Sequence, residues 1–484
     1  MHLPHHLSDL FNIAAMGKNT EVDMFSYLTD SLILIVISFL PFKEAAKTSI
    51  LSKRWRHLWH ETKKIEFDQS FFIKQQSGEE SKKIQRRIFI DFCKHWIQTY
   101  NPGLNANEFR LALSNPQESA TDIQLFIRFA VDHGVKALDL DFSRPKRDEN
   151  SLGDENQVGL LELPPFVYEH KGLESLTLFS CNFSVSLLNK FLALKSISLG
   201  GVKLSSSCLK ELVSNCPLLE SLSMKNCSDL GCINISSTTL MSLVIDKCSD
   251  LQNWIIIDVP KLRIFKYSGP LVHFAIEHLD ALVEADIDFG RETEFDEYGD
   301  LLYQLLSDIY RIRVLTVCSY MLQVIPSAEE YPCLKPPFDR VQHLTLRTAL
   351  HAYELHGISF FLNSCPNLEI LTIDIAPAII FPERGTDLAL EDHEFFSSNR
   401  LVIVYECVRK SLKKVEIKGF KGQLNEVVVI NYLLCYGLVL DTLSIVLSKE
   451  KGPNGMDMEE WYPKYAHKLL RFKRASKSLR ILIN

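Results

Sequence analysis

The feature that most constrains the fold of this 484-residue chain is an apolar pattern, L-x-x-L-x-L, that recurs twelve times. Its last two apolar positions are separated by a single residue, and this alternation is typical of a strand with one buried face. In the central part of the chain, successive units start 20 to 30 residues apart. A repeat of this length indicates an array of stacked units. The units begin at Val135, Leu173, Leu194, Leu219, Leu240, Leu262, Leu282, Ile312, Val341, Leu368, Leu412 and Leu440.

This period is typical of leucine-rich repeats. One strand with its return segment cannot cover its own apolar face, so neighbouring units must stack into a curved solenoid. We therefore predict an α/β fold with a curved parallel sheet and with helices or loops on the convex side. The 46% apolar composition is ample for such a core. The alternative is an unrelated α/β protein whose strands are rich in leucine.

The residues between the leucines predict a binding surface on the concave side of the sheet, because strand side chains alternate in direction. These positions are rich in serine and threonine in the early repeats, acidic in the middle and basic in the last ones. Such a graded surface suits a protein partner better than a small molecule. We expect target-binding contacts at Ser221, Ser223, Lys225, Asp246, Lys266, Glu284, Asp286, Asp288, His343 and Arg347.

An apolar block precedes the repeats, between Leu28 and Trp59. We predict three short helices here, with N-caps at residues 29–31 and at Ser52. The apolar run 32–37 is also compatible with a buried strand, and Pro41 ends it. The third helix carries its apolar residues at one face. About thirty residues cannot bury this much apolar surface alone, so we expect a second polypeptide to cover the tryptophans.

This block resembles the F-box, through Leu28-x-Asp30, the run Ser38-Phe39-Leu40-Pro41, and the stretch from Thr48 to Trp59 that reads TSILSKRWRHLW. The resemblance implies the substrate-receptor subunit of an SCF-type ubiquitin ligase. In that family the F-box binds a Skp-type adaptor, which binds a cullin, and the repeats hold the target. One departure is Thr29, where the family usually has proline. The implied adaptor-binding residues are Leu28, Leu32, Ile37, Leu40, Pro41, Ala45, Ile50, Leu51, Trp55 and Trp59.

The C-terminal tail resembles the FBD domain of plant F-box/leucine-rich-repeat proteins. The matching residues run from Leu412 to Gly422 (LKKVEIKGFKG) and end in Phe472-x-Arg474-Ala475-Ser476. We therefore predict four regions: a flexible tail at 1–23, an F-box at 24–64, a leucine-rich-repeat solenoid at 65–405, and an FBD-like domain with the terminal repeats at 406–484. A helix is also expected over 84–98.

No catalytic motif is present in the sequence, so we expect a non-catalytic protein without a cofactor or metal. His57 and His60 could share one helix face as metal ligands, but no third ligand lies at a suitable spacing, and ordinary exposed or packed histidines are favoured. The net charge of −7 does not favour nucleic acid, and the longest apolar run is too short for a membrane span. The twelve cysteines include no C-x-x-C, which favours reduced thiols in the cytoplasm or nucleus.

Two interpretations of function stay open at this point. The first is the ligase receptor described above. The second is a scaffold, or a receptor for a small ligand, that binds through its repeats without joining a ligase; Thr29 is the feature that favours it. The acidic stretch 284–300 could attract a basic target, although a solvated strand and loop would look the same.

Overall fold

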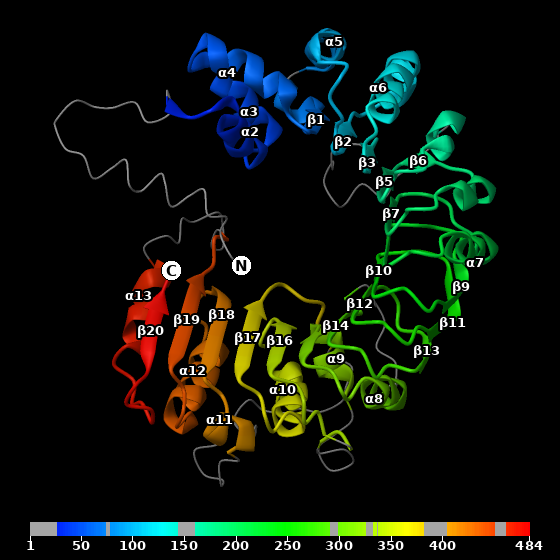
Figure 1. Ribbon diagram of the computed structural model, residues 1–484. Helices are drawn as coiled ribbons and strands as arrows, with labels where there is room; N and C mark the ends of the chain where they lie inside the picture. Colours follow the sequence, from blue (N-terminus) through cyan, green and yellow to red (C-terminus); the bar gives the residue numbers. More distant parts are fainter. Residues whose placement is uncertain are drawn as a thin grey trace, which may run out of the picture.

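The computed structural model describes residues 27–73, 78–143, 160–290, 299–325, 333–335, 337–381, 404–450 and 461–484. It forms an open arc whose inner face is a single parallel sheet (Figure 1). A group of helices stands at the N-terminal end of the arc, and β20 forms its other end. The predicted flexible tail at 1–23 lies outside the described residues. The predicted α/β solenoid is therefore confirmed.

The inner sheet has fifteen strands. All twelve predicted repeats form strands in it, and each pairs in parallel with the next repeat. The bounds are β1 Lys64–Asp68, β2 Glu108–Ala112, β3 Ala137–Asp141, β5 Ser175–Phe179, β7 Ser196–Gly200, β8 Ser221–Lys225, β10 Ser242–Asp246, β12 Ile264–Ser268, β14 Glu284–Asp288, β15 Val314–Val317, β16 His343–Thr348, β17 Ile370–Ile375, β18 Lys414–Phe420, β19 Thr442–Leu447 and β20 Arg480–Ile483.

Three of these strands, β1, β2 and β20, were missed by the repeat pattern. Their register with neighbouring strands places Thr62, Ala106 and Ser478 where the other repeats have their first leucine or valine. Strands along the sheet alternate buried and half-buried residues. The leucine positions thus form the core, and the intervening residues face the inside of the arc, as predicted.

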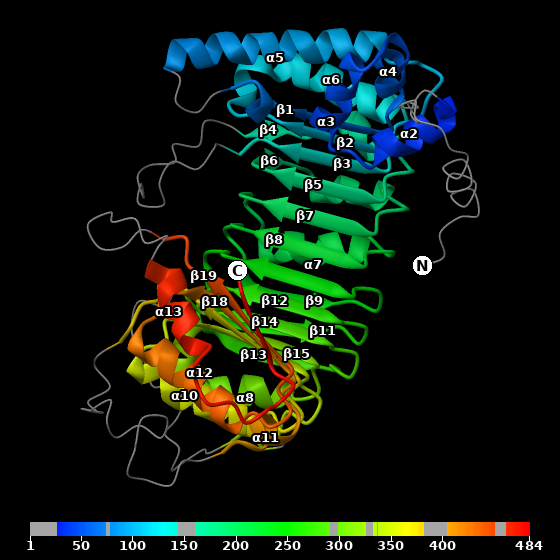
Figure 2. The same ribbon diagram turned by 90° about the vertical axis from the view of Figure 1, so that its left-hand side faces the viewer.

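Helices and two small outer sheets cover the convex side (Figures 1 and 2). The outer sheets are β4–β6 and β9–β11–β13, which form because the return segments of neighbouring repeats also run in parallel. Their strands are β4 Leu161–Glu162, β6 Cys181–Asn182, β9 Gly231–Ser236, β11 Leu251–Asp258 and β13 His273–Glu277. The helices are α5 Glu79–Thr99, α6 Ala120–Asp132, α7 Ser206–Asn215, α8 Gly299–Asp308, α9 Ser319–Val324, α10 Ala352–Ser364, α11 Glu406–Lys410, α12 Leu424–Tyr436 and α13 Trp461–Leu469, with 3-10 turns at η5 Gln69–Phe71, η6 Pro116–Ser119, η7 Pro165–Glu169 and η8 Val185–Lys190.

Buried cysteines mark the turn that follows several strands. Cys227 and Cys248 occupy the same place in adjacent repeats, and each thiol lies 3.6–3.7 Å from a carbonyl oxygen of the preceding repeat. The thiols thus satisfy backbone acceptors in the interior of the turn. All twelve cysteines are free thiols, in agreement with the interpretation drawn from their spacing.

The sheet continues without interruption through the predicted FBD-like region. Gly419 and Gly422 give this region its distinctive turn, because both adopt positive φ angles, of 75° and 81°. A side chain at Gly419 would place its Cβ 2.4 Å from the carbonyl oxygen of Ile375. The Gly-Phe-x-Gly pattern is therefore required by the backbone at the β18–α12 turn.

The N-terminal helices are α2 Asp30–Ser38, α3 Phe42–Lys47, η3 Thr48–Ile50, α4 Lys53–Leu58 and η4 Trp59–Glu61. The run 32–37 is helical, which confirms the predicted helix over the alternative of a buried strand. Helix α5 contains the helix expected over 84–98 and is longer at both ends. Among the described residues, no helix is both long enough and apolar enough to cross a bilayer.

Candidate protein-binding surfaces

One arginine links two of the N-terminal helices. The guanidinium of Arg54 in α4 donates a 2.6 Å hydrogen bond to the carboxylate of Asp30 and a 2.5 Å bond to the carbonyl oxygen of Leu28. Both partners lie at the start of α2. Ser52 caps α4 by accepting the amide of Trp55 at 3.3 Å, as the sequence predicted. These bonds fix the angle between α2 and α4.

The tryptophans correct a central expectation. Trp55 and Trp59 are only 6% and 7% exposed, so the chain covers them without a second polypeptide. Trp59 lies 5.7 Å from Phe42 and 6.0 Å from Trp96, measured between ring centroids. Trp96 belongs to α5 and also packs against Phe67 of β1, at 5.5 Å. The tryptophans are therefore part of the core that joins the N-terminal helices to the solenoid.

Other residues of these helices are exposed and apolar. Ile50 and Leu51 are 83% and 64% exposed, and both were among the predicted adaptor-binding residues. Phe39 is 82% exposed and was missed, as were three further residues that the same helices present to solvent. We call this set the apolar patch. Its members are Tyr27, Ile35, Val36, Phe39, Ile50 and Leu51.

The remaining predicted adaptor-binding residues divide by burial. Ile37 and Ala45 are buried in the chain's own core, so their assignment to a docking surface is wrong for the same reason as that of the tryptophans. Pro41 is exposed, and Leu28, Leu32 and Leu40 are half-buried. The buried residues had been assigned to the docking surface because they are apolar. Helix α2 is apolar on every side, so its sequence alone does not separate its inner face from its outer face.

The predicted target-binding residues all lie on strands of the inner sheet. Two ion pairs cross between these strands. Lys266 contacts Glu284 at 2.7 Å, and Arg347 contacts Asp286 at 2.7 Å. All ten predicted target-binding residues are half-buried. They lie on β8 (Ser221, Ser223 and Lys225), β10 (Asp246), β12 (Lys266), β14 (Glu284, Asp286 and Asp288) and β16 (His343 and Arg347).

His343 is the titratable imidazole of this face. Its Nε2 lies 3.0 Å from the hydroxyl of Thr372 on the neighbouring strand. Burial lowers the pKa of His343, an effect that Glu416 opposes and that Lys414 and Lys418 reinforce. The imidazole is therefore neutral at physiological pH, and it acts as a polar contact within the sheet surface.

A cavity of about 560 Å³ lies where the N-terminal helices meet the sheet. The α2–α3 link forms one wall with Phe39, Leu40 and Pro41, and inner-face residues of β1, β2, β3 and β5 form the floor. The pattern of the sequence did not reveal this cavity, because its two sides come together only in the folded chain. Its charged floor residues are Lys64, Glu66, Glu108, Arg110 and Asp139.

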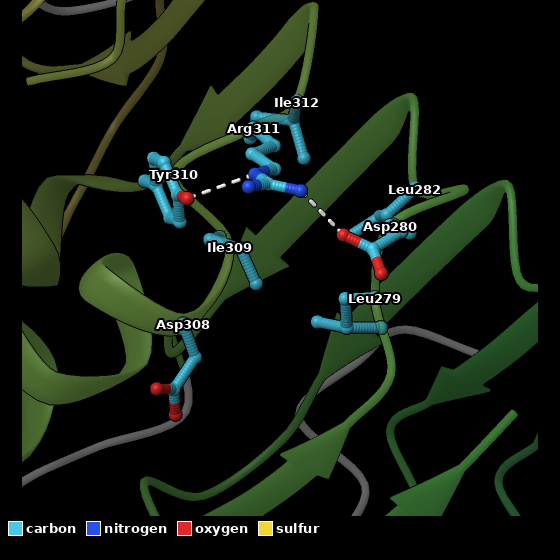
Figure 3. A pocket seen from close by; sticks show the side chains of 8 residues that line it. All are labelled: Leu279, Asp280, Leu282, Asp308, Ile309, Tyr310, Arg311 and Ile312. Atoms are coloured by element: carbon cyan, nitrogen blue, oxygen red, sulfur yellow. Dashed lines mark hydrogen bonds and ion pairs between the residues drawn. The ribbon is translucent and has the colours of Figure 1, made fainter. Parts of the chain in front are cut away.

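A shallower hollow of about 250 Å³ lies near α8 (Figure 3). Its arginine, Arg311, is already paired with the carboxylate of Asp280 at 2.5 Å and with the hydroxyl of Tyr310 at 2.8 Å. Asp308 points away from this pair, and burial raises the pKa of its carboxyl group. Arg311 and Asp280 are thus engaged with each other, Asp308 lies apart from them, and the lining residues include no nucleophile next to a base.

Within the described ranges, three metal-ligating side chains gather at the ends of β11 and β13: Asp258, Glu277 and His278. None is buried, and the His278 imidazole already lies 3.2 Å from the Asp258 carboxylate. The His60 ring lies 4.3 Å from that of Trp59 and stacks on Trp96 at 5.8 Å, and burial lowers its pKa. His60 is thus packed among aromatic rings, whereas His57 is exposed.

Comparisons with known proteins agree with this two-part organisation. Residues 25–66 match the F-box domain, and residues 100–481 match the At1g61320/AtMIF1 LRR domain. The LRR match includes most of the region that resembles the FBD domain. These matches agree with the N-terminal helices and the strand array described above.

Three Arabidopsis thaliana proteins illustrate the likeness. F-box protein At3g62230 is 32% identical over 434 residues, which cover 89% of this chain and 92% of that protein. Putative F-box/LRR-repeat protein At5g54820 is 32% identical over 477 residues, which cover 96% of this chain and 98% of that protein. FBD-associated F-box protein At1g66310 is 26% identical over 454 residues, which cover 90% of this chain and 92% of that protein.

Proposed function

Because this chain belongs to the plant F-box/LRR-repeat protein family, we propose that it is the substrate-recognition subunit of an SCF-type ubiquitin ligase. Its F-box binds a Skp-type adaptor and, through it, a cullin. The inner sheet holds a target protein. The chain itself performs no chemistry, and it acts in the cytoplasm, the nucleus or both.

The apolar patch is the observation that carries this proposal. It places six large apolar side chains in solvent on helices that span fewer than thirty residues. Exposed apolar groups gathered on one small module are typical of a protein-binding site. Ile50 and Leu51 are well placed as anchors, because they project from the short link between α3 and α4 and make up the most exposed pair of adjacent residues in the patch.

Thr29 does not weaken this proposal. It is the N-cap of α2, with φ of −67° and ψ of 157°, and its side chain makes no capping hydrogen bond. Proline fixes φ near −65°, so threonine here adopts the backbone conformation that the family's proline would impose. The expectation that Thr29 caps the helix through its side chain is wrong, but the entry into α2 is preserved.

The mechanism is proximity. A target held on the inner sheet is tethered to the cullin through the N-terminal helices, which raises the effective concentration of its lysines beside the ubiquitin-conjugating enzyme. The shared aromatic core of Phe42, Trp59 and Trp96 makes this tether rigid. We also propose that residues 406–484 form an FBD-like end of the solenoid, supported by the glycines at the β18–α12 turn and by the names of some relatives.

The test is co-purification of the tagged full chain with a Skp-type adaptor and a cullin. Replacing Ile50 and Leu51 with aspartate removes two exposed anchors without touching the core, and we expect adaptor recovery to fall at least about tenfold. Ile84→Asp is the matched control, because Ile84 is an exposed isoleucine on α5, 62% exposed and outside the patch.

Two results would reject the proposal. Absence of adaptor from the wild-type preparation would favour a scaffold that binds through its repeats alone. Equal recovery with the Ile50/Leu51 variant would show that the patch is not the docking surface.

A further inference from the structure

The cavity beneath the α2–α3 link has an unbalanced charge. Arg110 of β2 contacts the carboxylate of Asp139 at 2.5 Å, that of Asp141 at 3.4 Å and that of Glu66 at 3.6 Å. Asp68 adds to the negative field around the same guanidinium. The positive charge of one arginine is thus shared among four carboxylates. An arginine has five N–H donors, fewer than the eight oxygens of four carboxylates, so acceptor capacity remains.

The second cation of the cavity does not correct this excess. Lys64 on β1 is paired with Glu108 on β2 at 3.0 Å. The lysine therefore offsets a fifth carboxylate and leaves the surroundings of Arg110 acidic. The cavity floor is a place where an additional positive charge would be attracted.

Asp139 offers a specific acceptor for such a charge. Its Oδ2 receives the bond from Arg110, whereas its Oδ1 is buried and has no hydrogen-bond partner among the described residues. Burial raises the pKa of Asp139 despite the neighbouring arginine. A buried oxygen without a donor is destabilising, so a donor arriving from outside would recover a favourable interaction.

The opposite wall is apolar. Phe39 is 82% exposed, and Leu40 and Pro41 continue this wall over the sheet. A side chain with an apolar stem and a cationic head fits between an apolar wall and an acidic floor. A guanidinium also stacks favourably on an aromatic face and donates several hydrogen bonds at once, which favours arginine over lysine.

We propose that this cavity is a target-recognition subsite that takes an arginine side chain from a basic segment of the target protein. The guanidinium lies over the floor at Asp139 and Glu66, and the methylene stem packs against Phe39. The proposal rests on the proposed function as a target receptor. It adds a chemical class of target, a chain that presents an exposed arginine beside the F-box end of the solenoid.

The surroundings of Arg347 support the same class of target. There Asp286, Asp288 and Asp374 all raise the pKa of one arginine on the inner sheet. This second centre lies several repeats farther along the arc, between β14 and β17. An extended basic segment on the inner face would meet acidic groups at both places.

The test uses the full chain, co-expressed with its adaptor if that is needed for solubility, and a fluorescent twelve-residue peptide of alternating serine and leucine with three arginines. A matched peptide carries citrulline in place of arginine, which keeps the shape and removes the charge. We expect the arginine peptide to bind roughly fivefold to tenfold more tightly by fluorescence anisotropy, as partly exposed charge pairs allow.

Substitutions in the cavity test whether the arginine peptide binds there. Asp139→Asn with Glu66→Gln should reduce the affinity for the arginine peptide to that for the citrulline peptide. Thr177→Arg places the chain's own guanidinium at the cavity floor and should have the same effect. Glu416→Gln is the matched control, because Glu416 is a half-buried carboxylate on β18, on the same sheet face but outside both acidic centres, and this variant should retain the preference.

Equal binding of both peptides to the wild-type chain would overturn the proposal. So would an equal loss in the Glu416→Gln control, because the attraction would then come from the whole inner face. Adaptor recovery is measured in parallel; the substitutions at Asp139, Glu66 and Thr177 leave the anchors Ile50 and Leu51 unchanged, as well as Phe39, which belongs to both the apolar patch and the cavity wall. Loss of adaptor binding with intact arginine preference would refute the ligase assignment and leave the subsite standing.

Discussion

Arg347 on β16 reaches past β15 to Asp286 on β14, and its guanidinium donates two hydrogen bonds to that carboxylate, of 2.7 and 3.0 Å. The Asp286 side chain is 19% exposed and that of Arg347 is 39% exposed. The bond thus clamps three strands at the middle of the inner sheet. Both residues were predicted from sequence as target contacts, and the structure gives them this additional bond to one another.

We expect a double-mutant cycle with Arg347→Met and Asp286→Asn to show a coupling of about 1 kcal/mol in chemical denaturation, because the pair is bidentate and half-buried. The exposed pair Lys410–Glu406, with side chains 67% and 60% exposed, is the control and should show no measurable coupling. Equal results for the two pairs would mean that the clamp does not stabilise the sheet.

Trp59→Ala should lower the free energy of unfolding by about 3–5 kcal/mol, because it empties a core position shared by three aromatic rings. Leu51→Ala, on the exposed patch, should change it by less than about 0.5 kcal/mol. Urea denaturation of the two variants measures the difference. A small effect for Trp59→Ala would mean that the tryptophan is not part of the core in solution.

The carboxylate of Glu426 in α12 accepts the backbone amides of Lys421, Gly422 and Gln423 at 2.9, 2.7 and 3.2 Å. Glu426→Ala leaves these donors without that acceptor and should cost about 2–4 kcal/mol in unfolding free energy. Glu426→Gln keeps one acceptor oxygen and avoids the buried charge whose cost raises the pKa of Glu426. The glutamine variant should therefore be the more stable of the two, and the reverse order would contradict this account.

His343 predicts a dependence of stability on pH. Burial lowers its pKa in the folded chain below the value of about 6.5 for an unfolded histidine. The folded state thus favours the neutral imidazole. The contribution of His343 to stability is fully present above the pKa that this histidine has in the unfolded chain. It is lost as the pH falls through the lower pKa of the folded chain. The His343→Gln variant should lose less stability than the wild type between pH 7.5 and pH 5.5, measured by urea denaturation. An equal loss in both proteins would exclude His343 as the source.

Thr29→Pro should be tolerated and should stabilise the N-terminal helices by about 0.4–1 kcal/mol, because the native φ of −67° already suits proline. Adaptor recovery should be at least that of the wild type. Reduced recovery or a lower melting temperature would show that threonine is required at this position.

The leucines made most of the solenoid predictable from sequence, because each repeat encodes its own strand. Strands β1, β2 and β20 escaped this pattern, because Thr62, Ala106 and Ser478 replace the first apolar residue. In β1 and β2 these smaller residues are still buried, at 6% for Thr62 and 1% for Ala106. A pattern that admits small residues at the first position would have found them.

The docking surface was harder to predict. The sequence prediction considered only the helices that contain the tryptophans, whereas in the folded chain Trp59 also packs against Trp96 of α5. Those partners come from separate elements, and local sequence does not show such a contact. Phe39 follows a helix that is apolar on all sides, so its exposure depends on how α2 packs, which also determines the cavity beside it.

The ring contacts between Phe42, Trp59 and Trp96 have a practical consequence for experiments on this protein. A truncation that begins at β1 would remove Phe42 and Trp59 from one side of Trp96, and Phe42 from one side of Phe67. Such a fragment would aggregate or bind proteins non-specifically through its newly exposed aromatic rings. Loss of ligase assembly in it would therefore be uninformative, whereas full-length chains altered at Ile50 and Leu51 separate docking from folding.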